Sequence, residues 1–298
     1  MTRRWVPAVL CLVVIGALGI LTNRFLPRAS ADAVAAPLEP IAAQYTDPSL
    51  FLSLIKQSKT EPSSSVVTGI TVPHHLLATD LIATGFKFAS NSNPNQVVIL
   101  SPDHFNLGDT NVSTGARNFS TVFGELATDT SAVQSLEALP FVHDQTFFYR
   151  EHGVQAELPF VKHFFPNAKI VVIAIKESTP KAQVSELVDV LKRVITPNSL
   201  IVQSTDFSHY LTPSEAGEYD EQTLAALAIG DPDQLFALNE PKNIDSTAAQ
   251  YVQSRLQREY FHSGYQLLAH KNSQDYTTDQ VTSSTSYIVE GYTRPTAK

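Results

Sequence analysis

The chain has 298 residues, of which 43% are hydrophobic and 17% are charged, and its net charge at pH 7 is −8. This composition is ordinary for a globular protein with a sizeable core and excludes a largely disordered chain. The first 30 residues hold four arginines and no acid, so the rest carries the other 17 basic residues and all 29 acidic residues, a net charge of −12. A domain this acidic is a poor partner for nucleic acid, and we expect none.

Residues 1–30 have the pattern of a membrane-targeting segment. An apolar run from Trp5 to Leu21 follows two arginines. As a helix, this run would reach about 26 Å, slightly less than the roughly 30 Å hydrocarbon core of a bilayer. We therefore expect an N-terminal membrane anchor, with a cleaved signal ending near Ala29-Ser30-Ala31 or a buried helix as alternatives. An anchor or a signal would place the rest of the chain outside the cytoplasm, either membrane-anchored or secreted.

Residues 31–50 are rich in alanine and proline and predict a linker, after which residues 51–298 are expected to form one α/β domain. The single cysteine, Cys11, lies in the apolar run. The expected exported part therefore has no disulfide, and no thiol for catalysis or metal binding.

Strand-like and helix-like segments alternate along the domain, with Asn-, Ser- and Thr-rich residues 105–128 predicting loops or short strands. In chain order we expect a strand at Val66–Val72, a helix at Leu76–Ala89, a strand at Gln96–Leu100, a helix at Asp129–Leu139, a strand at Lys169–Ile175, a helix at Val184–Ile195, a strand at Leu200–Gln203, helices at Tyr219–Ile229, Pro232–Leu238 and Ser246–Tyr260, and a strand at Val281–Tyr292. This order predicts a mostly parallel or mixed central sheet flanked by helices on both faces.

Three of the strand-like runs end in a histidine close to a proline or an aspartate, namely His74, His104 and His209. Chemistry in open α/β sheets gathers beyond the carboxyl ends of the strands, so three such histidines indicate a site for a divalent metal. Each has a simpler interpretation. His74 or its neighbour His75 could begin the next helix, and His104 could be a surface loop residue.

Other polar residues near these segments have two interpretations. Glu151, His152 and Gln155 approximate one helical face, for which the simpler interpretation is a solvated face with a capping glutamate. If the chain turns helical after Thr205, Asp206 and His209 lie on one face and suit acid–base chemistry, although an N-cap aspartate is the simpler reading. Asp245 precedes a predicted helix, where an N-cap is the default role. His262 is the weakest candidate among the histidines.

These segments, in this order, resemble the Memo-like family, which includes protein B of the AmmeMemoRadiSam system and shares a fold with the class III extradiol dioxygenases. The resemblance covers about residues 66–292. It rests on five elements: Val72-Pro73-His74, Ser101-Pro102-Asp103-His104, Glu151 to Phe160, Ser204-Thr205-Asp206-Phe207-Ser208-His209-Tyr210, and Ser284-Thr285-Ser286-Tyr287.

The resemblance implies that His74 and His104 are metal ligands. Human-type Memo proteins have a cysteine as the third ligand, and this chain has Asp245 at the corresponding place. Two histidines and one carboxylate form the arrangement of non-haem Fe(II) oxygenases. The resemblance further implies that His209 is the acid–base histidine and that Asp206 orients it or acts from beside it. It also implies that Glu151 and His152 line the pocket.

Three functions remain open from the sequence. The first is a non-haem Fe(II)-dependent, dioxygenase-like redox enzyme, with copper or zinc as alternative metals. The second is a non-catalytic protein that binds metal or a peptide, and the third is a zinc-type hydrolase. Family relatives occur beside an AMMECR1-type protein and a radical SAM enzyme. Both partners would be cytosolic, which conflicts with an exported domain.

Overall fold

The computed structural model describes residues 38–294. The expected anchor or signal at residues 1–30 lies outside the described residues, and within 38–294 no helix is long and apolar enough to cross a membrane. The compact unit begins at Glu39, earlier than the expected domain start. Part of the expected linker packs on the domain, since Ile41 forms a bridge with Phe119. Helix α2 (Ser49–Gln57) follows.

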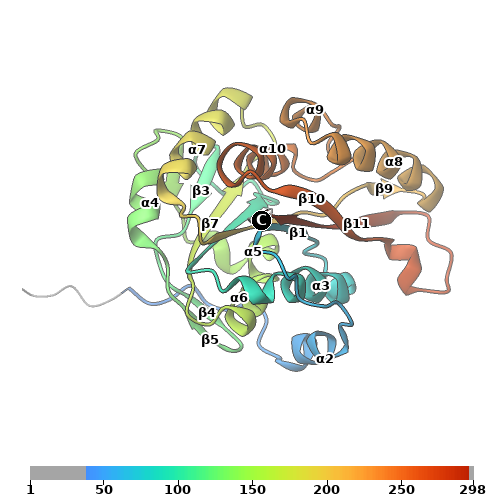
Figure 1. The fold of residues 1–298 in the computed structure, drawn as a ribbon, viewed down its shortest axis with the longest axis horizontal. Coiled ribbons are helices and arrows are strands. Elements are labelled where there is room, and N and C mark those ends of the chain that lie inside the picture. Colours follow the sequence, from blue (N-terminus) through green and yellow to red (C-terminus); the bar gives the residue numbers. More distant parts are fainter. Residues whose placement is uncertain (1–37, 295–298) are drawn as a thin grey trace, which may run out of the picture. The chain divides into compact units, whose positions relative to one another are not determined.

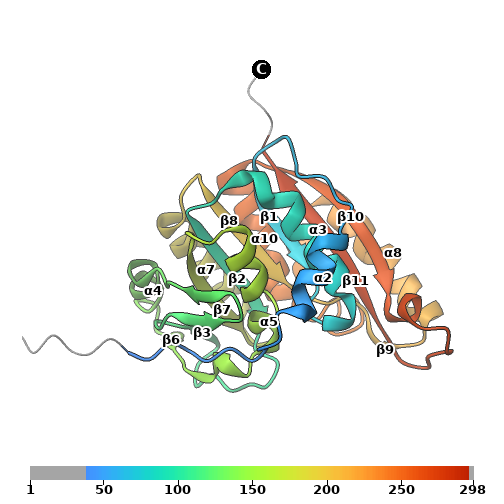
Figure 2. The same ribbon diagram turned by 90° about the horizontal axis from the view of Figure 1, so that it is seen from below.

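Four parallel strands form the middle of the sheet. Their spatial order is β1 (Val67–Val72), β8 (Ser199–Ser204), β2 (Gln96–Pro102) and β7 (Lys169–Ile175). Apart from the first residue of β7 they are buried throughout, which explains why they are near-continuous apolar runs in the sequence. Figure 2 shows β1, β8, β2 and β7 within the sheet.

The strand next to each side of this parallel centre, β11 (Ser284–Thr293) or β3 (Val112–Thr114), runs antiparallel to it, so the sheet is mixed. Beyond β1 lie β11 and β10 (Gly264–Asn272), and beyond β7 lie β3 and β6 (Val142–Asp144). Short β9 (His209–Leu211) pairs with β11, and β4 (Phe119–Thr121) and β5 (Gly124–Leu126) form a separate hairpin.

Helices cover both faces of the sheet (Figure 1), which confirms the expected α/β class. One apolar core joins the sheet to α2, α3 (Thr79–Ala89) and α6 (Leu158–Phe164). A second core on the opposite face joins it to α4 (Thr130–Leu136), α7 (Lys181–Val194) and α10 (Thr247–Leu256). The remaining helices are α5 (His152–Gln155), α8 (Pro213–Ile229) and α9 (Pro232–Phe236), with a π-helical turn at Gln257–Phe261.

Strand β10 was not expected from the sequence. It is an edge strand that pairs only with β11 among the described strands, and all of its residues are exposed or half-buried. Such a strand needs no alternating or continuous apolar pattern, so periodicity gives no signal for it.

The register of the parallel strands brings three loops to one end of the sheet. Val72 at the end of β1 pairs with Ser204 at the end of β8, and Leu100 of β2 pairs with Gln203. The residues that follow these strands, including His74, His104 and Asp206, therefore leave the sheet side by side.

Helix α3 approaches β1 so closely that Gly85 has no room for a side chain. A Cβ on Gly85 would lie 2.3 Å from Cγ1 of Val72. Val72 is a stiff, buried β-branched residue two positions before His74, so it cannot easily yield.

We expect Gly85→Ala to lower the free energy of unfolding by about 1–3 kcal/mol, although alanine is the better helix former. Gly217→Ala is the matched control, because Gly217 lies within α8 and a Cβ there meets nothing within 4 Å. The control should raise stability by up to about 1 kcal/mol. Urea unfolding followed by circular dichroism measures both, and equal effects of the two variants would refute the close-packing account.

Candidate metal centre

His74 is held by the end of β8 and the loop that follows it. It is 3% exposed, its backbone N–H donates to Oδ1 of Asp206 at 3.1 Å, and its Nδ1 lies 3.2 Å from Oγ of Ser204. These contacts direct its Nε2 toward the loops after β2 and α9. The neighbouring His75 points elsewhere, with its Nδ1 2.7 Å from the hydroxyl of Tyr287. His75 is the N-cap residue of the short helix at Leu76–Ala78, but its side chain makes no capping bond.

His104 is fixed by a buried carboxylate. Its Nδ1 lies 2.6 Å from Oε1 of Glu151, and its backbone N–H donates to Oε2 at 3.1 Å. Glu151 is fully buried and also caps α5 by accepting from the N–H of Gly153. A carboxylate on one imidazole nitrogen sets the tautomer and orients the other nitrogen, as commonly seen behind metal-binding histidines.

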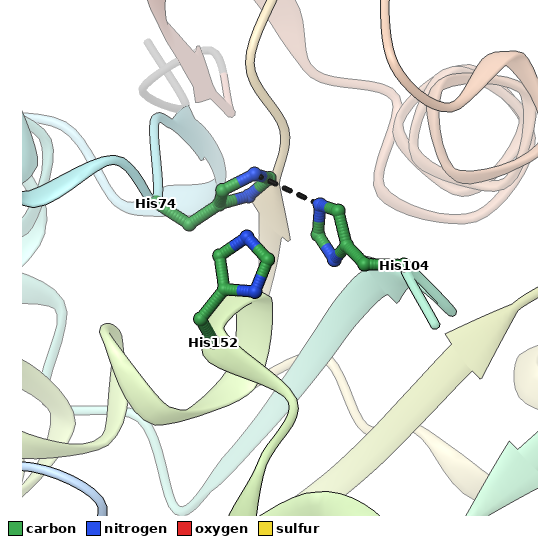
Figure 3. Close-up of side chains that lie close together, drawn as sticks. All are labelled: His74, His104 and His152. Atoms are coloured by element: carbon green, nitrogen blue, oxygen red, sulfur yellow. Dashed lines mark hydrogen bonds between the residues drawn. The ribbon is translucent and has the colours of Figure 1, made fainter. Parts of the chain in front are cut away.

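The three histidines His74, His104 and His152 form a cluster that can hold a divalent metal (Figure 3). One ligand atom from each lies within 4.8 Å of the others. The Nε2 atoms of His74 and His104 are 3.1 Å apart. Ligand atoms about 2.1 Å from one ion, at angles between octahedral and tetrahedral, are separated by about 3.0–3.4 Å, so this spacing fits a shared metal.

Asp245 joins this cluster from the segment before α10. Its Oδ2 lies 3.3 Å from Nε2 of His74 and 3.8 Å from Nε2 of His104, and its Oδ1 is buried without a hydrogen-bond partner among residues 38–294. The default interpretation of Asp245 as a helix N-cap is wrong, because Ser246 accepts the capping bond from the N–H of Ala249.

The segment after β8 is not helical, contrary to the geometry considered for Asp206 and His209. Phe207 instead forms a bridge with Ile244, and His209 begins β9. The cause is the pairing of this segment with β11 and with the residues before α10, which uses the backbone groups that a helix would need. Asp206 still faces the centre, with its Oδ2 3.8 Å from Nε2 of His74 and 4.0 Å from Nε2 of His209.

Burial and neighbouring charges shift the pKa values of the three histidines in different directions. Burial, together with the charges of His104 and His152, lowers the pKa of His74, and burial and His104 lower the pKa of His152 to about 4. Burial alone would also lower the pKa of His104, but Asp245 and Glu151 raise it to about 10. The two carboxylates thus favour one positive charge at this point, which is also where a metal ion would lie.

The acid–base candidates are shifted toward their neutral forms. Burial and the Asp245 carboxylate raise the pKa of Asp206 well above its usual value. Burial lowers the pKa of His209. The Nδ1 of His209 is buried and has no hydrogen-bond partner in the described part of the chain. A neutral imidazole with a free nitrogen beside a metal site is able to accept a proton.

Sequence reasoning missed two residues behind the cluster and two in front of it. Ser204 contacts His74 and its hydroxyl donates to Oε1 of the fully buried Glu157 at 3.5 Å. Burial and the charge of Asp206 raise the pKa of Glu157.

Gln44 and Tyr45 line a cavity of 360 Å³ in front of the cluster, together with His74, His75, Leu76, His152 and Asp206. Ser204 and Glu157 lie inside the motifs that resemble the family, so the sequence could have identified them as site residues. Gln44 and Tyr45 lie in the expected linker, where no motif indicates a site.

His262 plays no part in this site. It ends the π-helical turn after α10, where its Nδ1 lies 3.0 Å from the backbone oxygen of Arg258. Its φ of 53° is in the left-handed region.

A family model described as "Memo-like protein" matches residues 46–289. A "MEMO1 family protein" of Thermotoga petrophila is 24% identical over 220 residues, which are 72% of this chain and 78% of the relative. One of Saccharolobus solfataricus is 29% identical over 168 residues, 53% of this chain and 58% of the relative. The fold is also similar to the crystal structure of the uncharacterized protein JW3007 of Escherichia coli K12. The TM-score is 0.47 at 13% identity, over 75% of this chain and 99% of that one.

A second polar cluster holds the loop that carries Asp206 and His209. The hydroxyl of buried Ser208 donates to Oδ1 of Asp220 at 2.6 Å, and Oδ2 of Asp220 lies 2.8 Å from Nε2 of His270 on β10. Helix α8 is thereby tied both to this loop and to the edge of the sheet. The hydrogen bond to Asp220, with the charges of Asp220 and Asp275, raises the pKa of His270.

We expect His270→Gln to reduce stability in a pH-dependent way. A histidine whose folded pKa is raised stabilises the protein fully below its unfolded pKa of about 6.5, and this stabilisation is lost as pH rises through the folded pKa. The melting temperature of His270→Gln should thus fall furthest below wild type near pH 5.5 and approach it near pH 9, with a loss of at most about 1 kcal/mol because the ring is partly exposed. His143→Gln, which removes an exposed contact with Asp109, is the control. A deficit that does not depend on pH would contradict the charged pairing.

Proposed function

Because the chain belongs to the Memo-like family, we propose that its histidine cluster is a divalent-metal centre with His74, His104 and Asp245 as ligands. The observation that carries this proposal is the convergence of two imidazole nitrogens 3.1 Å apart and a carboxylate oxygen 3.3 Å from one of them. The second carboxylate oxygen, buried and unpartnered among residues 38–294, is an acceptor that a cation would satisfy.

His152 is the alternative third ligand, and its orientation favours a different role. Its ring centroid lies 4.0 Å from that of His104 with an angle of 37° between the planes. The two rings are therefore tilted against each other at short distance, whereas the Asp245 oxygen lies close to the nitrogens of both other ligands. We assign His152 and the buried Glu151 to the wall of the pocket, with Glu151 fixing the tautomer of His104.

Two nitrogens and one carboxylate oxygen suit Fe(II) in a redox enzyme of the dioxygenase-like kind, and they also accept zinc or copper. When bound, such a metal supplies Lewis acidity and, for iron, electron transfer. His209 would take the substrate proton at one of its ring nitrogens, and Asp206, 4.0 Å from its Nε2, would hold the ring in place. The cavity of 360 Å³ in front of the histidines has room for a small substrate.

The ligand assignment predicts different metal contents for two variants. Asp245→Ala should lose the metal or bind it at least about tenfold more weakly, while His152→Ala should retain it. Elemental analysis of protein purified without chelators measures the contents, and titration with Co(II) followed by its visible spectrum gives the affinities. Metal retained in Asp245→Ala but lost in His152→Ala would make the three histidines the ligand set.

The acid–base assignment predicts that His209→Ala keeps the metal but loses turnover by about 10²-fold or more. Metal-dependent O2 consumption with a catechol-like or enolisable substrate is the measurement. Full activity with zinc under anaerobic conditions would instead indicate a hydrolase, and tight metal binding without turnover across a broad substrate screen would indicate a binding protein.

The location of the domain and its partners belong to the same proposal. The N-terminal sequence supports display of the domain outside the cytoplasm, on a membrane anchor or in secreted form. An AMMECR1-type or radical SAM partner would then be out of reach, and the ligand would be a small molecule or peptide of that compartment.

A further inference from the structure

Large apolar side chains are exposed on the loops that carry the metal centre. Phe105 follows His104 and is 48% exposed, and Tyr210 follows His209 and is 78% exposed. Leu77, Leu107 and Tyr149 on the same loops are also exposed. Tyr210 has a φ of 61°, a left-handed conformation that a tyrosine adopts only at a cost of about 1 kcal/mol or more. Exposed apolar groups at the rim of a site commonly contact a ligand.

A chain of contacts leads from this rim to the histidines. The ring of Phe105 lies 5.7 Å from that of His152 and 6.4 Å from that of His104. The guanidinium carbon of Arg150 lies 6.0 Å from the Phe105 centroid. Phe105 is therefore close both to two histidines of the cluster and to a cation.

Arg150 is free to bind an anion. It is exposed, and its guanidinium forms no hydrogen bond or ion pair with any residue of the described part of the chain. Glu151, its neighbour in sequence, is engaged by His104 instead. The domain has a net charge of −12, so an unpaired arginine beside the site is a local positive charge that would attract an anion.

We propose that the site takes a ligand with a carboxylate joined to an apolar body, in which Arg150 binds the carboxylate and Phe105 contacts the body. This inference rests on the proposed function for the position of the reacting end, which would lie at the metal centre. A guanidinium presents a planar pair of N–H donors that matches the two oxygens of a carboxylate, and it is partly oriented by the aromatic face beneath it. Arg150 and Phe105 are thus specificity-determining residues, and neither is a metal ligand.

The simpler interpretation is that Arg150 only packs its side chain on Phe105, as exposed arginines often do. The two interpretations differ in what they predict for charge. A packing role would make Arg150 indifferent to whether a ligand carries a carboxylate or a neutral amide, whereas a binding role would not.

The test compares 3-phenylpropanoate with its neutral isostere 3-phenylpropanamide. Calorimetric titration of the full chain, loaded with Co(II), gives the Kd of each probe. We expect the carboxylate to bind about fivefold or more tightly than the amide in wild type. Arg150→Gln should abolish this preference, and Phe105→Ala should weaken both probes.

Arg258→Gln is the matched control. Arg258 is also exposed and makes no ion pair with residues 38–294, but it lies on the π-helical turn after α10. The variant should keep the carboxylate preference, and circular dichroism should confirm that all variants fold.

Equal binding of the two probes to wild type, or an unchanged preference in Arg150→Gln, would overturn the inference. The same titrations on metal-free protein separate it from the proposed function. If Co(II) binds through His74, His104 and Asp245 but Arg150→Gln changes nothing, this inference alone fails. If Co(II) does not bind yet the Arg150-dependent preference persists, the metal proposal fails instead.

Discussion

The site depends on the burial of several ionisable groups in a space where water cannot solvate them separately. Asp206, Asp245 and His74 are each nearly or fully buried and within 4 Å of one another or of a shared neighbour. Two carboxylates this close and this buried are costly to ionise together, which is why burial and Asp245 raise the pKa of Asp206 while Asp245 and Glu151 favour a positive charge on His104. A bound divalent cation would supply the same positive charge.

The scaffold that imposes this crowding is the set of parallel strands in register. Since β1, β8 and β2 end at the same level, the loops after them lie side by side at one end of the sheet. The loop before α10 joins them through reciprocal contacts, in which the N–H of Asp206 donates to Asp245 and the N–H of Asp245 donates to the backbone oxygen of Asp206. The position of Asp245 is thus set by backbone geometry and not by a helix cap.

Much of this was predictable from the sequence, for identifiable reasons. The buried parallel strands are rich in β-branched and other apolar residues and nearly free of charged ones, so their places in the chain were found, and the motifs at their ends identified the Memo-like family. The conformation after β8 was not predictable, because it is decided by pairing with residues some 40 and 80 positions later and not by local preference. Tyr45 and Gln44 were missed for a similar reason: an Ala- and Pro-rich segment gives no periodic signal even where it packs on the site. The position of Asp245 beside His74 could be expected only from the resemblance, since residue type alone favoured a cap.

Pairing of β1 with β11 has a consequence for how the centre comes into being. Strand β1, which leads directly to His74, finds one of its two neighbours only at residues 290–293, near the end of the chain. Asp245 likewise becomes available late. His74 therefore cannot be held in its final position, nor can Asp245 lie beside it, before residues 245–293 have been synthesised. The three-histidine cluster, which can hold a divalent metal, is thus completed by segments that lie far from His74 and His104 in the sequence.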